Sequence, residues 1–329
     1  MNPYPLATVA CFDPTCGELP RRKLDGPRLQ QFLQRLSEAG AESVLIAAST
    51  GHGHLRTPDE LEEFFRVAAE QPLPGVQRMG LLRPEDGVES SVRFLDLLHK
   101  LGYDVVFLRP GTDLAANASD EEVAESLRPL VQHASQLGLP VGLYSISDVS
   151  GLPLTANVAA NLVKGDGGDA IVAIKVTEAS HDASTRTFLQ HSALRRLKIV
   201  QGWDPFLARA LRDGNDDGIQ RCGVTSGPMS LAMFQYLHIL EAAKSKDWDE
   251  VEAAQNAVTL VFQAMQDDPA RFADLQRAKY IMGLGHPLCG EVTSEQVERV
   301  FEAVRALPRA VDRQRICRSL DLMQDGPFH

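Results

Sequence analysis

Ala170-Ile-Val-Ala-Ile-Lys-Val-Thr177 combines a run of apolar and β-branched residues with a lysine near its end. Such a run is typical of a strand that is buried on both faces of a parallel sheet. Lysine is rarely buried, because an ammonium group loses its hydration in an apolar environment. Burial favours the neutral amine, which can attack a carbonyl carbon and form a Schiff base. Lys175 is therefore either a covalent catalyst at the end of a strand or the point where that strand enters solvent.

Similar apolar runs alternate with amphipathic helical stretches up to about residue 225. The expected strands are Ala7–Phe12, Ser43–Ala48, Gln77–Leu82, Asp104–Leu108, Val141–Ser145, Ala170–Lys175, Lys198–Gln201 and Gly218–Gly223. Strands in this number, with a helix in most intervals, predict an α/β fold, the (β/α)8 TIM barrel. Thr57-Pro-Asp-Glu60 and Ser119-Asp-Glu-Glu122 have the pattern of capping boxes at helix starts, and Gly102 and Gly138 suit C-terminal caps.

After about residue 228 the pattern predicts helices only, near 229–245, 248–266, 269–282 and 293–306. The last of these begins with another capping box, Thr293-Ser-Glu-Gln296. The sequence has no internal repeat, low-complexity tract or long linker. We therefore expect a barrel catalytic domain over residues 1–228 and a C-terminal all-helical extension over 229–329 that packs on the barrel.

The composition excludes several classes of function. The net charge of −11 argues against nucleic acid or an anionic membrane as a partner. No apolar stretch approaches the roughly 20 residues of a membrane span, and the N-terminus has no signal segment, so we expect a cytoplasmic protein. The five scattered cysteines predict neither a disulfide framework nor a zinc cluster. We expect no metal and no cofactor.

In barrels of this kind the chemistry lies at the C-terminal ends of the strands. The second expected strand runs into Ala48-Ser-Thr-Gly-His52, the fifth ends in Leu143-Tyr-Ser145, and the seventh ends in Gln201-Gly-Trp-Asp204. Hydroxyl side chains followed by glycine form turns that can bind a carboxylate. A tyrosine opposite a lysine can relay the protons that imine chemistry requires.

These strand ends resemble the motifs of the dihydrodipicolinate synthase / N-acetylneuraminate lyase family of Schiff-base aldolases and lyases. The family's Gly-Ser/Thr-Thr-Gly-Glu motif is similar to Ala48-Ser-Thr-Gly-His52, and its Tyr-Asn-x-Pro-x-x-x-Gly motif is similar to Tyr144-Ser-Ile-Ser-Asp-Val-Ser-Gly151. Its lysine strand matches Ile174-Lys175. Each motif alone is weak, but three motifs in the right order and spacing form a strong signal. The resemblance runs from about residue 5 through the C-terminal helices.

The resemblance implies a role for each matched residue. Lys175 would form an imine with a 2-keto acid, usually pyruvate in this family, and Tyr144 would shuttle the proton. Ser49 and Thr50 would bind the carboxylate of the keto acid. An iminium withdraws electrons from the neighbouring carbon and so permits C–C bond cleavage or formation without a cofactor. The resemblance also implies a homotetramer, with a homodimer as the alternative.

Departures from the family pattern narrow the expected substrate. Dihydrodipicolinate synthases have an arginine at the position of Val149 and a second tyrosine in the region that here reads Phe107-Leu-Arg-Pro-Gly111. Their condensation reaction is therefore not expected. The sugar-acid lyase branch fits better, because Lys175-Val-Thr177 and Gly202-Trp-Asp-Pro205 resemble its motifs. Thr177, Gly202 and Asp204 are then candidate substrate-binding residues. Because His52 replaces the motif glutamate, a hydroxylated 2-keto acid other than sialic acid is expected.

Alternatives to the lyase remain open at the level of the sequence. They are a dehydratase that uses the same imine, a dihydrodipicolinate synthase-like condensation, and a non-catalytic barrel that binds a keto acid. His52 and His54 form a pair that could ligate a metal, although no carboxylate-rich motif accompanies them, and His52 is expected to contact the distal part of the substrate. Arg109 would bind an anionic substrate or form a surface ion pair.

Overall fold

A computed structural model describes residues 4–16, 23–216, 219–270, 272–288 and 292–324 of the chain. A closed parallel barrel forms its centre, and β1 pairs with β10 to complete the ring. The fold predicted from the sequence is confirmed. The barrel strands are β1 (Ala7–Ala10), β2 (Ser43–Ile46), β3 (Gln77–Leu81), β4 (Val105–Leu108), β5 (Val141–Ser145), β6 (Ile171–Val176), β7 (Lys198–Gln201) and β10 (Cys222–Ser226).

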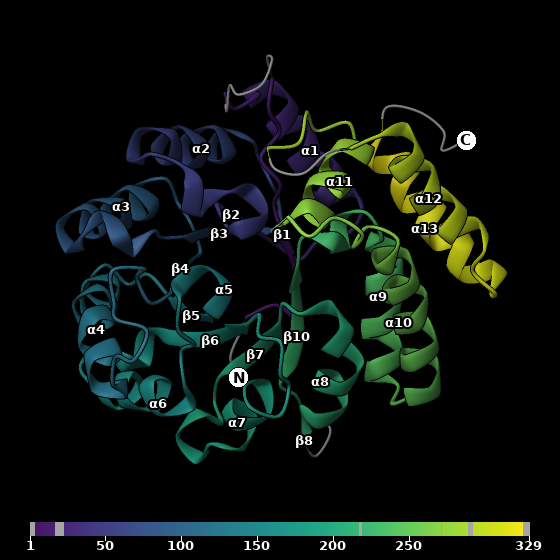
Figure 1. Cartoon of the computed structure of the whole chain (residues 1–329). Coiled ribbons are helices and arrows are strands. Elements are labelled where there is room, and N and C mark those ends of the chain that lie inside the picture. Colours follow the sequence, from purple (N-terminus) through teal and green to yellow (C-terminus); the bar gives the residue numbers. More distant parts are fainter. Residues whose placement is uncertain (1–3, 17–22, 217–218, 271, 289–291, 325–329) are drawn as a thin grey trace.

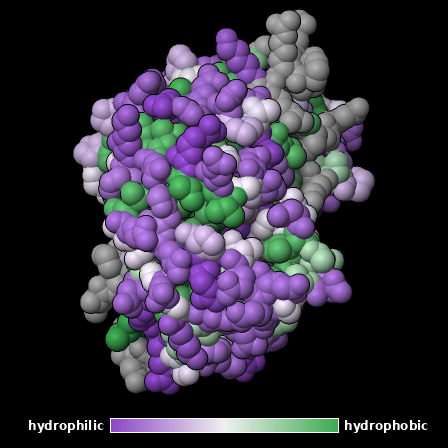
Figure 2. All heavy atoms as spheres, turned by 90° about the vertical axis from the view of Figure 1, so that its left-hand side faces the viewer, coloured by the Kyte–Doolittle hydropathy of each residue, from purple (hydrophilic) through white to green (hydrophobic). Residues whose placement is uncertain are grey.

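Helices surround the barrel, and α9, α10, α12 and α13 lie together on one side of it (Figure 1). The face that carries α2 to α4 is mainly hydrophilic, because these helices turn their apolar sides toward the barrel (Figure 2). No helix in the described ranges is long and apolar enough to cross a membrane. The helices are α1 (Gly26–Glu38), α2 (Pro58–Glu70), α3 (Val88–Lys100), α4 (Asp120–Gln136), α5 (Ser147–Ser150), α6 (Ala156–Lys164), α7 (Thr185–Gln190), α8 (Leu207–Asp213), α9 (Met233–Lys244), α10 (Trp248–Gln263), α11 (Ala273–Ile281), α12 (Ser294–Arg305) and α13 (Ala310–Met323).

Local sequence signals set several of these boundaries. Thr57, Ser119 and Thr293 each cap a helix, and each cap is completed by the side chain of the residue three positions later. These capping boxes satisfy backbone N–H groups that have no partner within the helix. Gly102 and Gly138 follow α3 and α4 with φ values of 73° and 71°, which agrees with the predicted C-terminal caps.

The prediction of the eighth barrel strand over 218–223 is wrong. β8 (Asn215–Asp216) and β9 (Ile219–Gln220) form a small antiparallel pair in this region, while Gly218 lies outside the described residues. The barrel strand is β10, in which Val224 pairs with Ala7 and Thr225 pairs with Thr8. The sequence pattern misses this strand because its last two residues, Thr225 and Ser226, are polar. Thr225 lines the pocket described below, and Ser226 donates a hydrogen bond to another lining residue, Asp204.

The chain after β10 is helical, as predicted, but it contains a helix that the sequence pattern did not reveal. The helix α13 begins after Arg309, which makes no side-chain capping hydrogen bond. It packs against α9 and α1. Helix α11 reaches back toward the barrel, where the residues that follow it meet the segment after β1: the Thr15 N–H donates to the Leu284 carbonyl at 2.9 Å. The barrel and the helical region therefore share an interface.

Candidate active site

Lys175 lies inside the barrel near the C-terminal end of β6. Its neighbours in the sheet are Tyr144 on β5 and Val200 on β7. The side chain is 3% exposed, so the strand does not simply enter solvent at this residue. Its Nζ atom lies 4.2 Å from the centre of the Tyr144 ring. The amine and the aromatic ring therefore face the same space.

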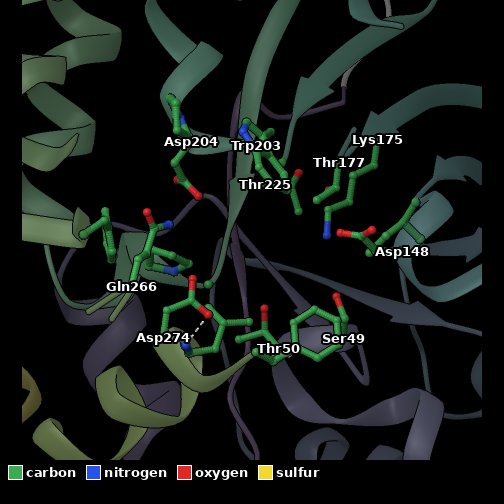
Figure 3. A pocket seen from close by; sticks show the side chains of 18 of the residues that line it. Ser49, Thr50, Asp148, Lys175, Thr177, Trp203, Asp204, Thr225, Gln266 and Asp274 are labelled. Atoms are coloured by element: carbon green, nitrogen blue, oxygen red, sulfur yellow. Dashed lines mark hydrogen bonds between the residues drawn. The ribbon is translucent and has the colours of Figure 1, made fainter. Parts of the chain in front are cut away.

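That space is a pocket of about 240 Å³ at the C-terminal end of the barrel. Seven of the residues that the sequence proposes for catalysis or substrate binding line it: Ser49, Thr50, Tyr144, Lys175, Thr177, Gly202 and Asp204. Figure 3 shows Lys175 and Asp148 on one side of the pocket, with Asp204, Gln266 and Asp274 facing it from the other side. Residues far apart in sequence thus meet at one place, as expected for strand ends in a barrel.

Ser49 and Thr50 occupy a tight turn that follows β2. Residues Ser49–Gly51 form a single 3-10 turn, in which the His52 N–H donates to the Ser49 carbonyl at 3.0 Å. The turn is flanked by Ala47 and His52, which have positive φ values of 60° and 52°. These left-handed conformations are unusual for residues with a Cβ atom, so tertiary contacts must hold them. The turn directs both hydroxyl-bearing residues to the pocket.

Tyr144 and Thr177 are joined by a hydrogen bond across neighbouring strands. The Tyr144 hydroxyl donates to Thr177 Oγ1 at 3.2 Å. Gly202 leaves room for this pair, because a Cβ atom there would lie 2.1 Å from Thr177 Oγ1 and 3.1 Å from Lys175 Cε. The candidate binding position 202 is thus a glycine for a steric reason, because no larger residue fits beside the lysine.

Glu178 organises the loop after β5, a role that the sequence analysis missed. Its carboxylate accepts hydrogen bonds from the Ser145 hydroxyl at 2.6 Å, the Ser147 N–H at 2.9 Å and the Ser147 hydroxyl at 2.5 Å. These bonds fasten the strand end and the short helix α5, which carries Asp148, to the segment that follows β6. The only signal in the sequence is a carboxylate two residues beyond a barrel strand, which does not by itself indicate its partners.

The far wall of the pocket combines polar and acidic side chains with apolar ones, among them Phe262, Phe272 and Leu275. Thr259, Gln263 and Gln266 reach it from α10 and the segment after it, and Asp274 reaches it from α11. Asp204 accepts hydrogen bonds from the Ser226 hydroxyl at 2.6 Å and from the Tyr236 hydroxyl.

The two acids of this wall resist ionisation. Burial raises the pKa of Asp204 to about 6, against the hydrogen bonds from Ser226 and Tyr236, and the charge of Asp274 adds to the increase. Burial also raises the pKa of Asp274. The far wall therefore combines one acid from the end of β7, Asp204, with one from helix α11, Asp274, which the strand-end motifs did not predict.

Thr225 is a further lining residue that the sequence analysis did not single out. It is buried on β10 near the Tyr4 hydroxyl, and its own hydroxyl makes no hydrogen bond of ordinary geometry within the described part of the chain. A buried hydroxyl without a partner is costly unless a ligand or water satisfies it. Thr225 is therefore available to bind a polar group in the pocket. The misplaced eighth strand is the reason that the sequence did not reveal it.

Three expectations about neighbouring residues need correction or refinement. His52 does not line the pocket; it is buried behind the Ser49–Thr50 turn, where its Nδ1 atom lies 2.9 Å from Asp13 Oδ1. Arg109 does not line the pocket either, and its ion pair with Glu85, at 2.5 Å, is buried rather than on the surface. Val149 packs against the apolar residues inside the barrel.

The His52/His54 pair does not form a metal site with other ligands. The rings stack with their centroids 6.5 Å apart, and His54 contacts Phe272 edge-on. Within the described ranges, no group of three or more histidine, cysteine, aspartate or glutamate side chains could hold a metal ion.

Comparisons with known proteins agree with this arrangement. No family model matches the chain. An N-acetylneuraminate lyase of Citrobacter koseri is 24% identical over 300 residues, which cover 90% of this chain and 94% of that protein. Among solved structures, YagE of Escherichia coli K12, a prophage protein of the dihydrodipicolinic acid synthase family in complex with pyruvate, has a TM-score of 0.77 at 17% identity. The match covers 92% of this chain and 98% of YagE.

A second solved structure, CdNal of Clostridium difficile in complex with mannosamine, has a TM-score of 0.76 at 15% identity. This match covers 92% of this chain and 98% of that protein. The sequence relatives and the structural neighbours therefore agree with the resemblance inferred from the strand-end motifs. The chain is a divergent homologue of the N-acetylneuraminate lyases that has the fold of the dihydrodipicolinate synthase family.

Proposed function

We propose that this chain is a carbon–carbon lyase that cleaves or forms a bond next to the carbonyl of a 2-keto acid through a Schiff base on Lys175. The observation that carries the proposal is the buried Lys175 amine, 4.2 Å from the Tyr144 ring, in a pocket that also contains Ser49 and Thr50. The relatives that bear the name N-acetylneuraminate lyase, and the structural neighbour that binds pyruvate, support the same chemistry.

The proposed reaction uses the amine as nucleophile. Lys175 Nζ adds to the keto carbon, and loss of water leaves a protonated imine. Tyr144 gives its phenol proton to the departing hydroxyl, and the resulting phenolate accepts the proton of the hydroxyl on the fourth carbon while the bond between the third and fourth carbons breaks. The contact with Thr177 orients the ring of Tyr144. The electron pair moves into the imine and forms an enamine. Protonation of the enamine and hydrolysis then release pyruvate and regenerate the amine.

The keto acid would be oriented by its carboxylate. The hydroxyls of Ser49 and Thr50 and the backbone of their turn face the pocket on the β2 side, so they can donate hydrogen bonds to an anion. This placement leaves the rest of the substrate pointing toward the far wall. Thr225, with its unsatisfied hydroxyl, adds another possible contact between the two ends.

The charges of the far wall define the distal half of the substrate. The acidic and basic residues that line the pocket are Asp148, Lys175, Asp204 and Asp274. Asp204, whose pKa is about 6, is mainly ionised at neutral pH, and its charge disfavours a second carboxylate on the substrate, because like charges in a partly buried site repel each other strongly. Hydroxyl groups can instead donate hydrogen bonds to these acids. This supports a hydroxylated 2-keto acid and argues against a dihydrodipicolinate synthase-like condensation.

Covalent trapping tests the proposal directly. Incubation with pyruvate and borohydride should reduce the imine to a stable secondary amine, which peptide mass spectrometry should locate on Lys175. The variants Lys175→Arg and Lys175→Ala should not be labelled and should remain folded by circular dichroism. A panel of 2-keto-3-deoxy sugar acids then distinguishes the reactions: a lyase releases pyruvate, a dehydratase releases water, and a binding protein does neither. A panel of 2-keto acids that leaves Lys175 unlabelled contradicts the covalent mechanism.

A further inference from the structure

A buried polar cluster lies behind the Ser49–Thr50 turn. At its centre is Asp13, which follows β1 and is completely buried. Asp13 accepts a hydrogen bond from Arg56 Nη2 at 2.6 Å, and Lys279 Nζ on α11 lies 3.4 Å away. Its third partner is His52 Nδ1, at 2.9 Å. The cluster thus joins the segment after β1, the loop after β2 and helix α11.

Asp13 remains a carboxylate in this setting. Burial alone raises the pKa of an aspartate, but here the interaction with His52 and the charges of Lys279 and Arg56 outweigh burial and hold the pKa of Asp13 well below its usual range. The charged carboxylate is therefore a permanent acceptor at the centre of the cluster.

The direction of every hydrogen bond through His52 can be assigned. The Leu288 N–H can only donate, and it lies 2.6 Å from Gln276 Oε1. The amide nitrogen of Gln276 therefore faces His52 Nε2, at 2.7 Å, and donates to it. His52 Nε2 must accept, so the ring proton resides on Nδ1 and is donated to Asp13. His52 thus bridges Gln276 and Asp13, with one ring nitrogen that accepts and one that donates.

This bridge connects the two ends of the pocket. On one side, His52 ends the turn that presents Ser49 and Thr50, and its left-handed backbone conformation has φ 52°. On the other side, Gln276 lies on α11, the helix that supplies Asp274 and Leu275 to the far wall. The buried hydrogen bond between His52 and Gln276 thus fixes the distance between the Ser49–Thr50 turn at one end of the pocket and helix α11 at the other.

We propose that His52 is a positioning residue that holds helix α11 against the Ser49–Thr50 turn and thereby sets the span of the substrate pocket. The identity of the substrate rests on the proposed function, but the link between the turn and the helix does not. His52 acts through its neighbours and does not touch the substrate, in contrast to the distal contact expected from the sequence.

The variant His52→Asn should remove the contact with Gln276 and keep the contact with Asp13. Asparagine tolerates the left-handed conformation, and its amide can still donate to Asp13, but it has no group at the position of Nε2. Hydrogen–deuterium exchange should become faster in residues 273–281 and remain unchanged in residues 49–52. Because a buried hydrogen bond contributes roughly tenfold in an equilibrium constant, KM for a hydroxylated 2-keto acid substrate should rise about tenfold. The rate of pyruvate trapping on Lys175 should stay within about twofold of wild type.

Gln276→Leu removes the other partner and should give the same pattern, without an additive effect in the double variant. The control is Gln235→Leu. Gln235 is also a buried glutamine of the helical region; it donates to Asp312 Oδ1 at 2.9 Å and to the Ala254 carbonyl at 3.1 Å, and none of these three residues lines the pocket. The variant Gln235→Leu should lower the melting temperature without changing KM or the rate of hydrogen–deuterium exchange in residues 273–281.

The outcomes decide between a positioning role and a purely structural one. An unchanged exchange rate of α11 in His52→Asn, or the same rise in KM in Gln235→Leu, would overturn the inference. A loss of pyruvate trapping as large as the loss of affinity for the full substrate would also overturn it. In that case the Ser49–Thr50 turn itself would depend on the contact with Gln276. If the wild type does not trap pyruvate, the proposed function fails, while the exchange measurement still tests the bridge.

Discussion

Among single residues, Tyr144 offers the clearest separation of chemistry from folding. Tyr144→Phe keeps the ring that packs over the Lys175 amine and removes only the hydroxyl that donates to Thr177. Turnover should fall by roughly 10²–10⁴-fold, the usual contribution of a positioned general acid or base. Steady-state kinetics and a thermal melt would check this together. An unchanged rate with an intact fold assigns the proton transfer to another group.

Asp204 makes the stability of the fold depend on pH. Its pKa is raised from the ordinary 3.8 to about 6, chiefly by burial. The folded protein therefore keeps this proton over a pH range in which the unfolded chain releases it. Its contribution to the free energy of unfolding is most favourable at acid pH and is lost as the pH rises through about 6.

Asp204→Asn cannot ionise, so it should gain stability relative to wild type between about pH 4 and about pH 6, with no further gain above that range. Urea unfolding at several pH values measures this difference. The comparison variant is Asp182→Asn, which replaces an exposed aspartate whose pKa is lowered by the hydrogen bond from Arg186, so its stability relative to wild type should change with pH in the opposite direction. A constant difference between Asp204→Asn and wild type across the range would show that Asp204 is ionised at all these pH values.

The sequence indicates site residues where the type of side chain and its place at a strand end coincide. Lys175 and Tyr144 meet both conditions, and the structure places them in one pocket. His52 occupies a motif position but turns away from the pocket, because Asp13 and Gln276 satisfy its ring from behind. Asp274 comes from a helix about 100 residues after the lysine. Such contacts arise from packing between distant segments, which one sequence does not encode locally.

At the scale of the elements, the end of β7 leaves no space for a side chain at residue 202. Gly202 lies against both Thr177 and Lys175, so Gly202→Ala places a methyl group where the lysine side chain passes. The variant should fold, because the clash involves side chains at the rim of the barrel, and it should lose borohydride trapping with pyruvate. The comparison variant is Gly75→Ala, at a position with open space around it but a positive φ of 77°. That variant should lose some stability and retain trapping.

The start of a helix is predictable in this chain when a capping signal marks it in the sequence. Helices α2, α4 and α12 begin at capping boxes that are visible in the sequence, and their starts agree with the structure. Helix α13 has no such cap and was missed. The sequence pattern places the eighth strand too early, because the final residues of this strand, Thr225 and Ser226, are polar and do not continue an apolar run. Functional requirements thus obscure the pattern of the element that carries them.

For the whole molecule, the assembly state remains a prediction from the family resemblance. We expect a homotetramer, and the helical region offers exposed apolar side chains such as Leu260 and Val311 for contacts between copies. Sedimentation velocity at micromolar concentration should show one species with four times the 36.0 kDa of the chain. A monomer would contradict the expectation, and a dimer would support the stated alternative.

The closure of the barrel between β1 and β10 has a consequence for synthesis and folding. Ala7 and Val224 pair although they lie near opposite ends of the barrel sequence, so this contact requires a large loop to close and belongs to the slow steps of folding. The pocket additionally needs α11, so a nascent chain lacks the complete pocket until about residue 275 has left the ribosome. A ligand of this pocket can therefore stabilise only the finished ring, and its protective effect should appear in global unfolding rather than in any early intermediate.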